Sequence, residues 1–189
     1  MERKQIKLTG VSPLMVQSDR LANPLDPLSK ELKQYTGKRT KTDEDHEMIY
    51  RLKWEGGLYH DGTRPVMPGY ALRAMIRSGA KLSKRGKQIQ RGVQIAQPEV
   101  PIEYDGPRDI EGLWANDKFR DVRSVNVKNS KVMTCRPIFH EWSITFTLTV
   151  NEEIINMSEV IEILELCGEI EGLCENRMNS YGRFTVEVV

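Results

Sequence analysis

The sequence predicts an α+β protein with a β-α-β-β-α-β core, with helices on one face of a sheet and hairpins inserted between the core elements. Three observations support this fold class. Residues 5–11, 143–150 and 184–189 alternate apolar and polar side chains, which is typical of half-buried strands. Residues 68–86 and 156–168 place apolar side chains at helical spacing. The chain order of these segments is strand, helix, strand, helix, strand, with broken strand pieces before residue 143.

The first third of the chain adds two helices outside this core. Residues 12–28 are rich in proline and form a long loop, which a short helix at residues 29–35 follows. A second helix begins after Thr42, because three acidic side chains follow this N-cap, and it ends at Gly56-Gly57. Residues 57–67 then read as a hairpin that turns at Asp61-Gly62.

The segment at residues 68–86 predicts one helix that Pro68 begins. Its apolar and basic side chains lie on two different sides of the helix. The apolar side holds Leu72, Met75, Ile76 and Gly79, and the basic side holds Arg73, Arg77, Lys81 and Lys84. We therefore expect one side to face the core and the other to carry charge.

The second half of the chain supplies a hairpin and the rest of the core. Residues 122–139 predict a hairpin that turns at Asn129-Ser130 and contains no acidic residue. The helix at residues 156–168 has Asn156 or Ser158 as its N-cap and ends at Gly168. The final strand places Phe184 on the same face as two valines, so we expect its ring in the core. Residues 1–189 are expected to form a single domain.

The charge is strongly segregated along the chain, although the net charge is only +1. Residues 62–98 hold eight Lys or Arg and no acid, and the other 152 residues hold 20 basic and 27 acidic side chains. Residues 141–189 contain ten acids and two bases. This pattern indicates either a polyanionic partner for one face, or two faces of the protein that attract each other.

Several classes of protein lack support in the sequence. No apolar run approaches the roughly 18 residues of a membrane span, and the first residues show no secretory signal. Three cysteines without a CxxC pair are expected as buried thiols in a cytoplasmic protein. The spacing of His and Cys predicts no metal site, and no phosphate-binding or nucleophile-elbow motif predicts a cofactor.

Two segments resemble the RAMP superfamily of CRISPR-associated RNA-binding proteins. The superfamily's pattern begins with a turn, continues with two prolines around a hydrophobic residue and then a glycine, and ends in a basic helix. Residues 57–77 are similar to this pattern. The matching positions are Pro65, Met67, Pro68, Gly69, Ala71, Leu72, Arg73 and Arg77, and, in the closing loop and strand, Gly172, Gly182, Arg183 and Phe184. Tyr70 and Ala74 depart from the pattern, because a small residue and glycine are usual there. The length and layout also resemble small phage-encoded proteins, for which the compartment is the host cytoplasm.

The resemblance implies a ferredoxin-like (RRM-like) domain that binds single-stranded RNA, or less commonly single-stranded DNA. Backbone subunits of this superfamily hold guide-RNA phosphates at the Pro-Gly helix start and assemble along the strand. The partners implied are therefore further copies of this chain or other CRISPR-type subunits. By the same resemblance, residues 122–136 are expected to be the thumb hairpin that reaches a neighbouring subunit.

The basic residues are the candidates for phosphate binding, since each neutralised phosphate releases counterions. The candidate nucleic-acid-binding residues are Gly69, Arg73, Arg77, Lys81, Lys84, Arg85, Lys87, Arg91, Lys128, Lys131 and Arg183. The alternative is a solvated face that pairs with the acidic C-terminal helix. Tyr181 is a further candidate for stacking on a base.

The binding prediction requires no catalysis, but two alternatives remain open. The first is an endoribonuclease, with His60 as a general base next to Tyr59. Target-cleaving relatives carry an aspartate after the first strand, where this chain has Asp19 and Asp26. Asp26 also fits a plain proline turn. The second alternative is a phage structural or assembly protein, whose basic segment binds an acidic protein.

Overall fold

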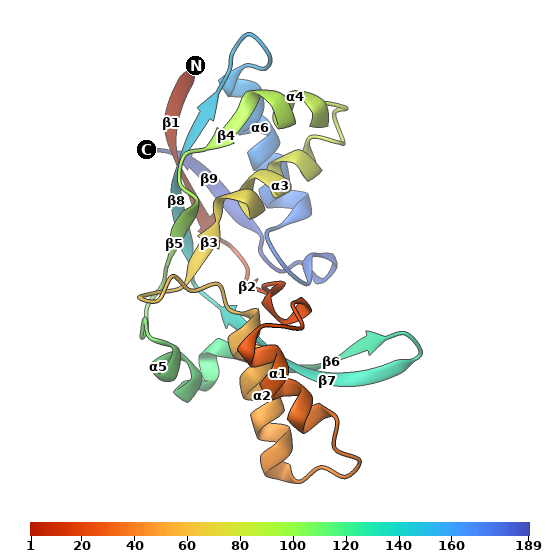
Figure 1. The fold of residues 1–189 in the computed structure, drawn as a ribbon. Helices are drawn as coiled ribbons and strands as arrows, with labels where there is room; N and C mark the ends of the chain where they lie inside the picture. The colour runs from red at the N-terminus through yellow and green to blue at the C-terminus, as the bar shows by residue number, and fades with distance from the viewer. The chain divides into compact units, whose positions relative to one another are not determined.

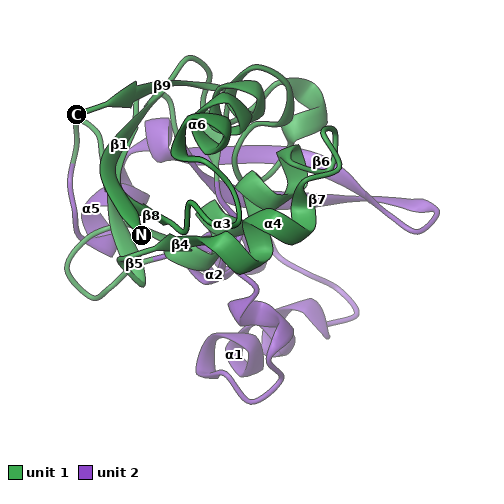
Figure 2. Cartoon of the chain, turned by 90° about the horizontal axis from the view of Figure 1, so that it is seen from above, with its two compact units in different colours: residues 1–15, 60–106, 139–189 green, residues 16–59, 107–138 purple.

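The computed structural model describes all of residues 1–189, which group into two compact units. Unit 1 comprises residues 1–15, 60–106 and 139–189, and unit 2 comprises residues 16–59 and 107–138 (Figure 2). Each unit is therefore assembled from segments that are far apart in the sequence.

Unit 1 is built on an antiparallel sheet in the order β3-β5-β8-β1-β9, with β4 also paired to β8. The strands are β1 (Glu2–Gly10), β3 (Val66–Pro68), β4 (Val93–Ile95), β5 (Glu99–Glu103), β8 (Ser143–Val150) and β9 (Phe184–Val188). The central strand β1 places Ile6 opposite Phe146 of β8 and Val188 of β9. The short strand β2 (Leu14–Met15) follows β1.

Three helices cover one face of this sheet: α3 (Gly69–Gly79), α4 (Gly86–Gly92) and α6 (Met157–Leu166) (Figure 1). The strands contribute Ile6 and Phe146 to the core, and the helices contribute Leu72, Ile76 and Leu164, all of which are buried. The order β1, α3, β4 with β5, β8, α6, β9 is that of a ferredoxin-like domain. The predicted fold class is therefore confirmed.

The helix predicted at residues 68–86 ends early, at Gly79, and a second helix, α4, begins only at Gly86. α3 ends at Gly79, and the chain then closes on itself, because the Arg85 N–H donates to the Ala80 carbonyl at 2.8 Å and the Lys84 N–H donates to the Lys81 carbonyl at 3.1 Å. These two bonds form a Schellman-type ending with Lys84 in the left-handed region at φ 60°. The predicted basic stripe is thus wrong beyond Arg77: Lys81 and Lys84 lie in the connecting turn.

Two further boundaries differ from the prediction. The hairpin expected at residues 57–67 is reduced to one bridge between His60 and Pro65, since Val66–Pro68 pairs with β5 instead. Helix α6 does not stop at Gly168 but continues as a π-helix, Cys167–Glu171, and ends at Gly172 with φ 76°. The predicted Asn156 cap is confirmed, because Asn156 and Glu159 form a capping box.

Unit 2 contains α1 (Pro27–Thr36), α2 (Asp43–Gly57), α5 (Ile110–Ala115), β6 (Arg120–Val127) and β7 (Ser130–Phe139). Short 3-10 helices lie at Arg20–Ala22 and Asp117–Phe119, and a third, in unit 1, at Arg177–Asn179. α1 lies beside α2, whose predicted N-cap Thr42 is confirmed by a capping box with Asp45. The Trp54 indole N–H donates to the Phe119 carbonyl at 2.8 Å, and the Trp54 ring packs on Trp114 with 5.5 Å between centroids. These contacts hold α2 and α5 in one small core.

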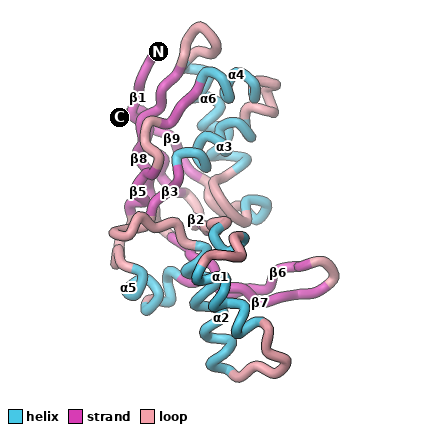
Figure 3. The backbone as a smooth tube through the Cα atoms, viewed as in Figure 1, coloured by secondary structure: helices cyan, strands magenta, loops and turns pink.

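The hairpin of β6 and β7 is a long two-stranded arm (Figure 3), and its tip at residues 126–133 is exposed. Val127 pairs with Ser130, so the turn residues are Lys128 and Asn129, one position earlier than the sequence predicted. Four large apolar side chains on the hairpin are exposed: Val122, Val127, Val132 and Met133. No helix in the structure has the length and apolar composition that a bilayer span requires.

Candidate nucleic-acid interface

Most of the positive charge on α3, α4 and the turn between them is not neutralised within the protein. Of the eight basic residues in residues 62–98, Arg85 forms an ion pair with Glu159 of α6 at 2.6 Å, and Arg64 pairs with Glu103 at 3.9 Å. The other six form no ion pair, and we call them the basic surface: Arg73, Arg77, Lys81, Lys84, Lys87 and Arg91. The alternative of a face paired with the acidic C-terminal helix therefore applies to Arg85 alone.

Arg73 and Arg77 are positioned by one turn of α3. The Arg73 guanidinium donates to the backbone carbonyl of Gln90 on α4, which fixes its direction and leaves other N–H donors free. Arg77 follows one turn later and is exposed. These two residues, with Tyr70, Ala74 and Gln90, line a hollow of about 240 Å³. Two guanidinium groups thus face one open hollow, which suits an anionic ligand.

The remaining members of the basic surface lie on the turn and on α4. Lys81 and Lys84 are exposed in the turn, and Lys87 and Arg91 are exposed in the first and last turns of α4. The predicted basic residues are therefore brought onto neighbouring elements, although not onto one helix.

Gly69 has a different role from the one the resemblance implies. It is buried at the start of α3, and its N–H donates to the Pro98 carbonyl at 2.8 Å. A Cβ atom at this position would lie 2.3 Å from the Gln97 carbonyl oxygen. Glycine is thus required by the close approach of the protein's own backbone, and its N–H is already occupied.

The other two groups of binding candidates lie on separate elements. Lys128 and Lys131 are exposed at the tip of the β6–β7 hairpin, which belongs to unit 2. Arg183, just before β9, points into the C-terminal loop, where Nη2 donates to the Arg177 carbonyl at 3.4 Å and Nη1 is buried. Phe184 is buried and contacts Trp142 edge-on at 6.4 Å, which confirms its predicted place in the core.

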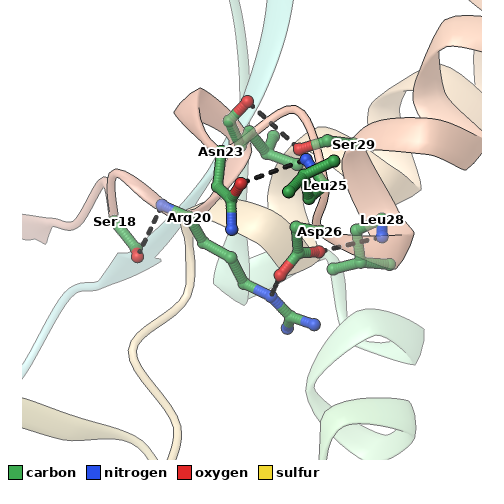
Figure 4. Close-up of polar contacts among 8 residues, drawn as sticks. Ser18, Arg20, Asn23, Leu25, Asp26, Leu28 and Ser29 are labelled. Atoms are coloured by element: carbon green, nitrogen blue, oxygen red, sulfur yellow. Dashed lines mark hydrogen bonds and ion pairs between the residues drawn. The ribbon is translucent and has the colours of Figure 1, made fainter.

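Asp26 is held by two local contacts that account for its presence (Figure 4). One carboxylate oxygen accepts from the Leu28 N–H at 2.9 Å as the N-cap of α1, and the other accepts from the Arg20 Nε at 2.9 Å. The Arg20 hydrogen bond is the main cause that lowers the pKa of Asp26. This carboxylate therefore caps α1, a role that the plain proline turn predicted from the sequence did not include.

The other catalytic candidates also sit in local turns. Asp19 precedes the 3-10 helix Arg20–Ala22, and its carbonyl accepts from the Ala22 N–H at 2.8 Å. His60 Nδ1 accepts from the Gly62 N–H at 3.0 Å, in a turn where hydrogen bonds from Thr63 and Arg64 lower the pKa of Asp61 to about 2. His60 belongs to unit 1, and both aspartates belong to unit 2. No group of three or more His, Cys, Asp or Glu side chains is arranged to hold a metal ion.

The structure adds residues that the sequence did not single out for binding. A second hollow, of about 410 Å³, lies at the start of α3 and is lined by Tyr70 and Arg73 together with Gln94 and Gln97. Tyr70 and Arg73 therefore border both hollows. The available signal for Tyr70 was its departure from the small residue usual in the RAMP pattern, whereas nothing local marks the glutamines.

Comparisons with known proteins identify the fold through solved structures. No protein-family model matches the sequence, and no curated protein matches it. A chain in the cryo-EM structure of the type III-B Cmr-beta bound to cognate target RNA matches with a TM-score of 0.58 and 12% identity, covering 100% of this chain and 61% of that one. A chain of a type IV-B CRISPR complex matches with a TM-score of 0.50 and 10% identity, covering 100% and 90%.

These likenesses establish the fold. The chain spans about three fifths of the length of the Cmr-beta chain, and its whole length superposes on a subunit of each complex. The ferredoxin-type architecture expected from the sequence is therefore confirmed.

Proposed function

We propose that this protein binds single-stranded RNA through its backbone phosphates, with the basic surface of α3, the turn and α4 as the contact. The observation that carries the proposal is that six of eight basic side chains in an acid-free segment have no acidic partner. The fold shared with a subunit of an RNA-bound complex supports the choice of RNA. No catalytic step is part of this function.

The basic surface suits phosphates because it offers several mobile charges instead of one enclosed site. Four of its members are exposed Lys or Arg on the turn and α4, and Arg73 and Arg77 face an open hollow. Each phosphate neutralised on a single strand releases condensed counterions, so the logarithm of the binding constant falls by roughly 0.7 per contact with the logarithm of salt concentration.

The test is the salt dependence of binding to a fluorescent uridine RNA, measured by anisotropy for the wild type and for Arg73→Ala, Arg77→Ala, Lys81→Ala combined. If three phosphate contacts are lost, the slope becomes shallower by about 2. The matched control changes Lys30, Lys33 and Arg39 to Ala, since these three exposed residues of unit 2 carry the same charge and do not belong to the basic surface.

The two triple variants separate local contact from net charge. The proposal expects the control to keep the wild-type slope, because only contacted phosphates release counterions. Equal salt slopes in the wild type and in the combined Arg73, Arg77 and Lys81 variant would place the phosphate contact elsewhere. A DNA strand of the same sequence, run in parallel, is expected to bind with a similar slope, because phosphates carry most of the interaction.

The β6–β7 hairpin carries a second part of the proposal, which is assembly of several copies along one strand. Its tip combines exposed Lys128 and Lys131 with the exposed apolar side chains of Val127 and Val132. Such a surface suits contact with RNA and with a second copy of the chain.

Assembly is tested by the mass of complexes formed on RNAs of increasing length, measured by light scattering. We expect the number of bound copies to grow with RNA length, and Val127→Glu with Val132→Glu to reduce it while one copy still binds. One copy on every RNA, whatever its length, would reject assembly and leave RNA binding intact.

A further inference from the structure

Tyr70 is a large aromatic side chain that the fold does not use. It lies in the first turn of α3, is 64% exposed, and forms no ring contact or hydrogen bond with the rest of the protein. Its neighbours Gly69 and Leu72 are buried, so the helix is anchored without it. Since most of the ring is exposed and no hydrogen bond or ring contact holds it, it is available as a contact surface.

The position of Tyr70 is special because hollows lie on both sides of it. It borders the hollow of about 410 Å³ towards Gln94 and Gln97, and the hollow of about 240 Å³ towards Arg77 and Gln90. Arg73, one turn along the helix, borders both hollows as well. An aromatic residue and an arginine are thus available to both hollows.

The larger hollow contains one amide that is occupied and one that is free. The Gln97 side chain is bound to β8, because its Oε1 accepts from the Thr147 N–H at 3.0 Å and its Nε2 donates to Thr147 Oγ1 at 3.2 Å. The Gln94 side chain is exposed and has no such partner. Its amide both donates and accepts, so it is able to pair with the edge of a base.

These groups match the chemistry of one nucleotide of a single strand. Any base has a π face that stacks on an aromatic ring. The phosphate of the nucleotide supplies the negative partner that Arg73 and Arg77 do not have within the protein. No acidic side chain borders either hollow. A protein ligand would need apolar anchors or acidic groups here, whereas a nucleotide supplies both the flat face and the negative charge.

We propose that a nucleobase of the bound strand stacks on Tyr70 in the larger hollow, with its phosphate at Arg73 and Arg77 and its edge at Gln94. This inference rests on the proposed function and adds a base contact to the phosphate contacts. Tyr70 stands where the RAMP pattern has a small residue, so the contact belongs to this chain's own sequence.

The experiment compares two strands of equal charge: a twelve-nucleotide uridine RNA and a twelve-unit ribose-phosphate strand without bases. The wild type is expected to bind the uridine strand about tenfold more tightly, because stacking is lost on the abasic strand. Tyr70→Ala should lower affinity for the uridine strand by about tenfold and leave the abasic strand unchanged, whereas Tyr70→Phe keeps the ring and the affinity.

A matched control and a second readout keep the result specific. Leu82→Ala removes an equally exposed apolar side chain, 60% exposed in the nearby turn, and should change neither affinity. A 2-aminopurine base in the strand should lose fluorescence on binding to the wild type and retain it with Tyr70→Ala.

The failure of this inference differs from the failure of the proposed function. If Tyr70→Ala binds the uridine strand as the wild type does, and both strands bind with a steep salt dependence, stacking is refuted and phosphate binding stands. If the wild type binds neither strand at low salt, the proposed function is refuted and the base contact with it.

Discussion

At the scale of single residues, two residues of opposite kinds, a glycine and an aspartate, show how closely the backbone of unit 1 is specified. Gly69 is required for the approach of α3 to residues 97 and 98, where any Cβ would meet a carbonyl oxygen. Asp61 holds the turn before β3, because its carboxylate accepts from the Thr63 hydroxyl at 2.7 Å and from the backbone N–H of Thr63 and Arg64. Both residues prepare the start of α3, from which Tyr70 and Arg73 project.

We expect Gly69→Ala to lower the free energy of unfolding by about 1–3 kcal/mol, since the methyl group forces the backbone of α3 away from Gln97. Urea denaturation measures this loss. The control is Gly86→Ala at the start of α4, where a Cβ meets only ordinary contacts at 3.7 Å, so stability should stay equal or rise. Equal stability of the two variants would contradict the close approach at Gly69.

The Asp61 turn gives a pH dependence whose sign is fixed by its lowered pKa. Because the folded pKa is about 2 and the ordinary value is 3.8, the contribution of Asp61 to stability is complete above about pH 4 and is lost as the pH falls towards 2. Thr63→Ala removes the largest cause and should raise the pKa towards 3.8, whereas Thr63→Ser should keep it near 2. Carboxyl chemical shifts measured against pH test both, and a Thr63→Ala titration identical to that of the wild type would disprove the role of the hydroxyl.

At the scale of elements, the sequence predicted the core strands and helices because their apolar patterns are long and regular. β8 and α6 follow directly from alternation and from helical spacing, and the caps Thr42 and Asn156 are residue types with a known preference. The turn between α3 and α4 was not predictable, because it closes on a lysine at φ 60°, where glycine or asparagine is usual.

The candidate site shows the same limit. The acid-free segment predicted where the basic charge is concentrated, since that depends on composition alone, but it did not predict that Arg64 and Arg85 form ion pairs. The split into α3, turn and α4, the ion pair of Arg85 and the two hollows depend on contacts between distant segments, such as Arg73 with Gln90 and Arg85 with Glu159. Local patterns contain no information on those pairs.

The contact between the turn and α6 gives a prediction of its own. Glu159→Gln removes the charge that neutralises Arg85 but keeps an oxygen for the capping box with Asn156. We expect stability to fall by less than about 1 kcal/mol, because the pair is partly exposed, and the salt slope of RNA binding to steepen by roughly 0.7 as Arg85 gains a phosphate.

Glu162→Gln is the matched control for this change, since Glu162 is an exposed residue of α6 without an ion pair. It alters the net charge equally and should leave the slope unchanged. Steeper salt slopes in both variants would assign the effect to net charge. An unchanged salt slope in Glu159→Gln would mean that Arg85 does not contact the strand.

At the scale of the whole molecule, a nearly neutral protein carries charge of both signs on different surfaces. α6 and its π-helical extension expose Glu162, Glu165 and Glu169, while the basic surface on α3, the turn and α4 contains no acid. At its sequence pI of about 7.7 the protein has no net charge, yet each surface still attracts ions of the opposite sign.

We therefore expect low-salt retention on both a cation and an anion exchanger at pH 7.7, as measured by elution in a salt gradient. The combined Arg73, Arg77 and Lys81 variant should elute earlier from the cation exchanger and should not elute earlier from the anion exchanger. Flow-through on both columns would indicate that the two surfaces neutralise each other.

The pairing of β1 has a consequence for how the chain is made. β1 leaves the ribosome long before its partners, which are β8, beginning at Ser143, and β9, ending at Val188. At roughly 5–20 residues per second, Ile6 and Leu8 wait on the order of ten seconds for the strands that bury them. A nascent chain that has not yet reached β8 cannot close this sheet, so its apolar strand is open to chaperones and proteases for most of the synthesis.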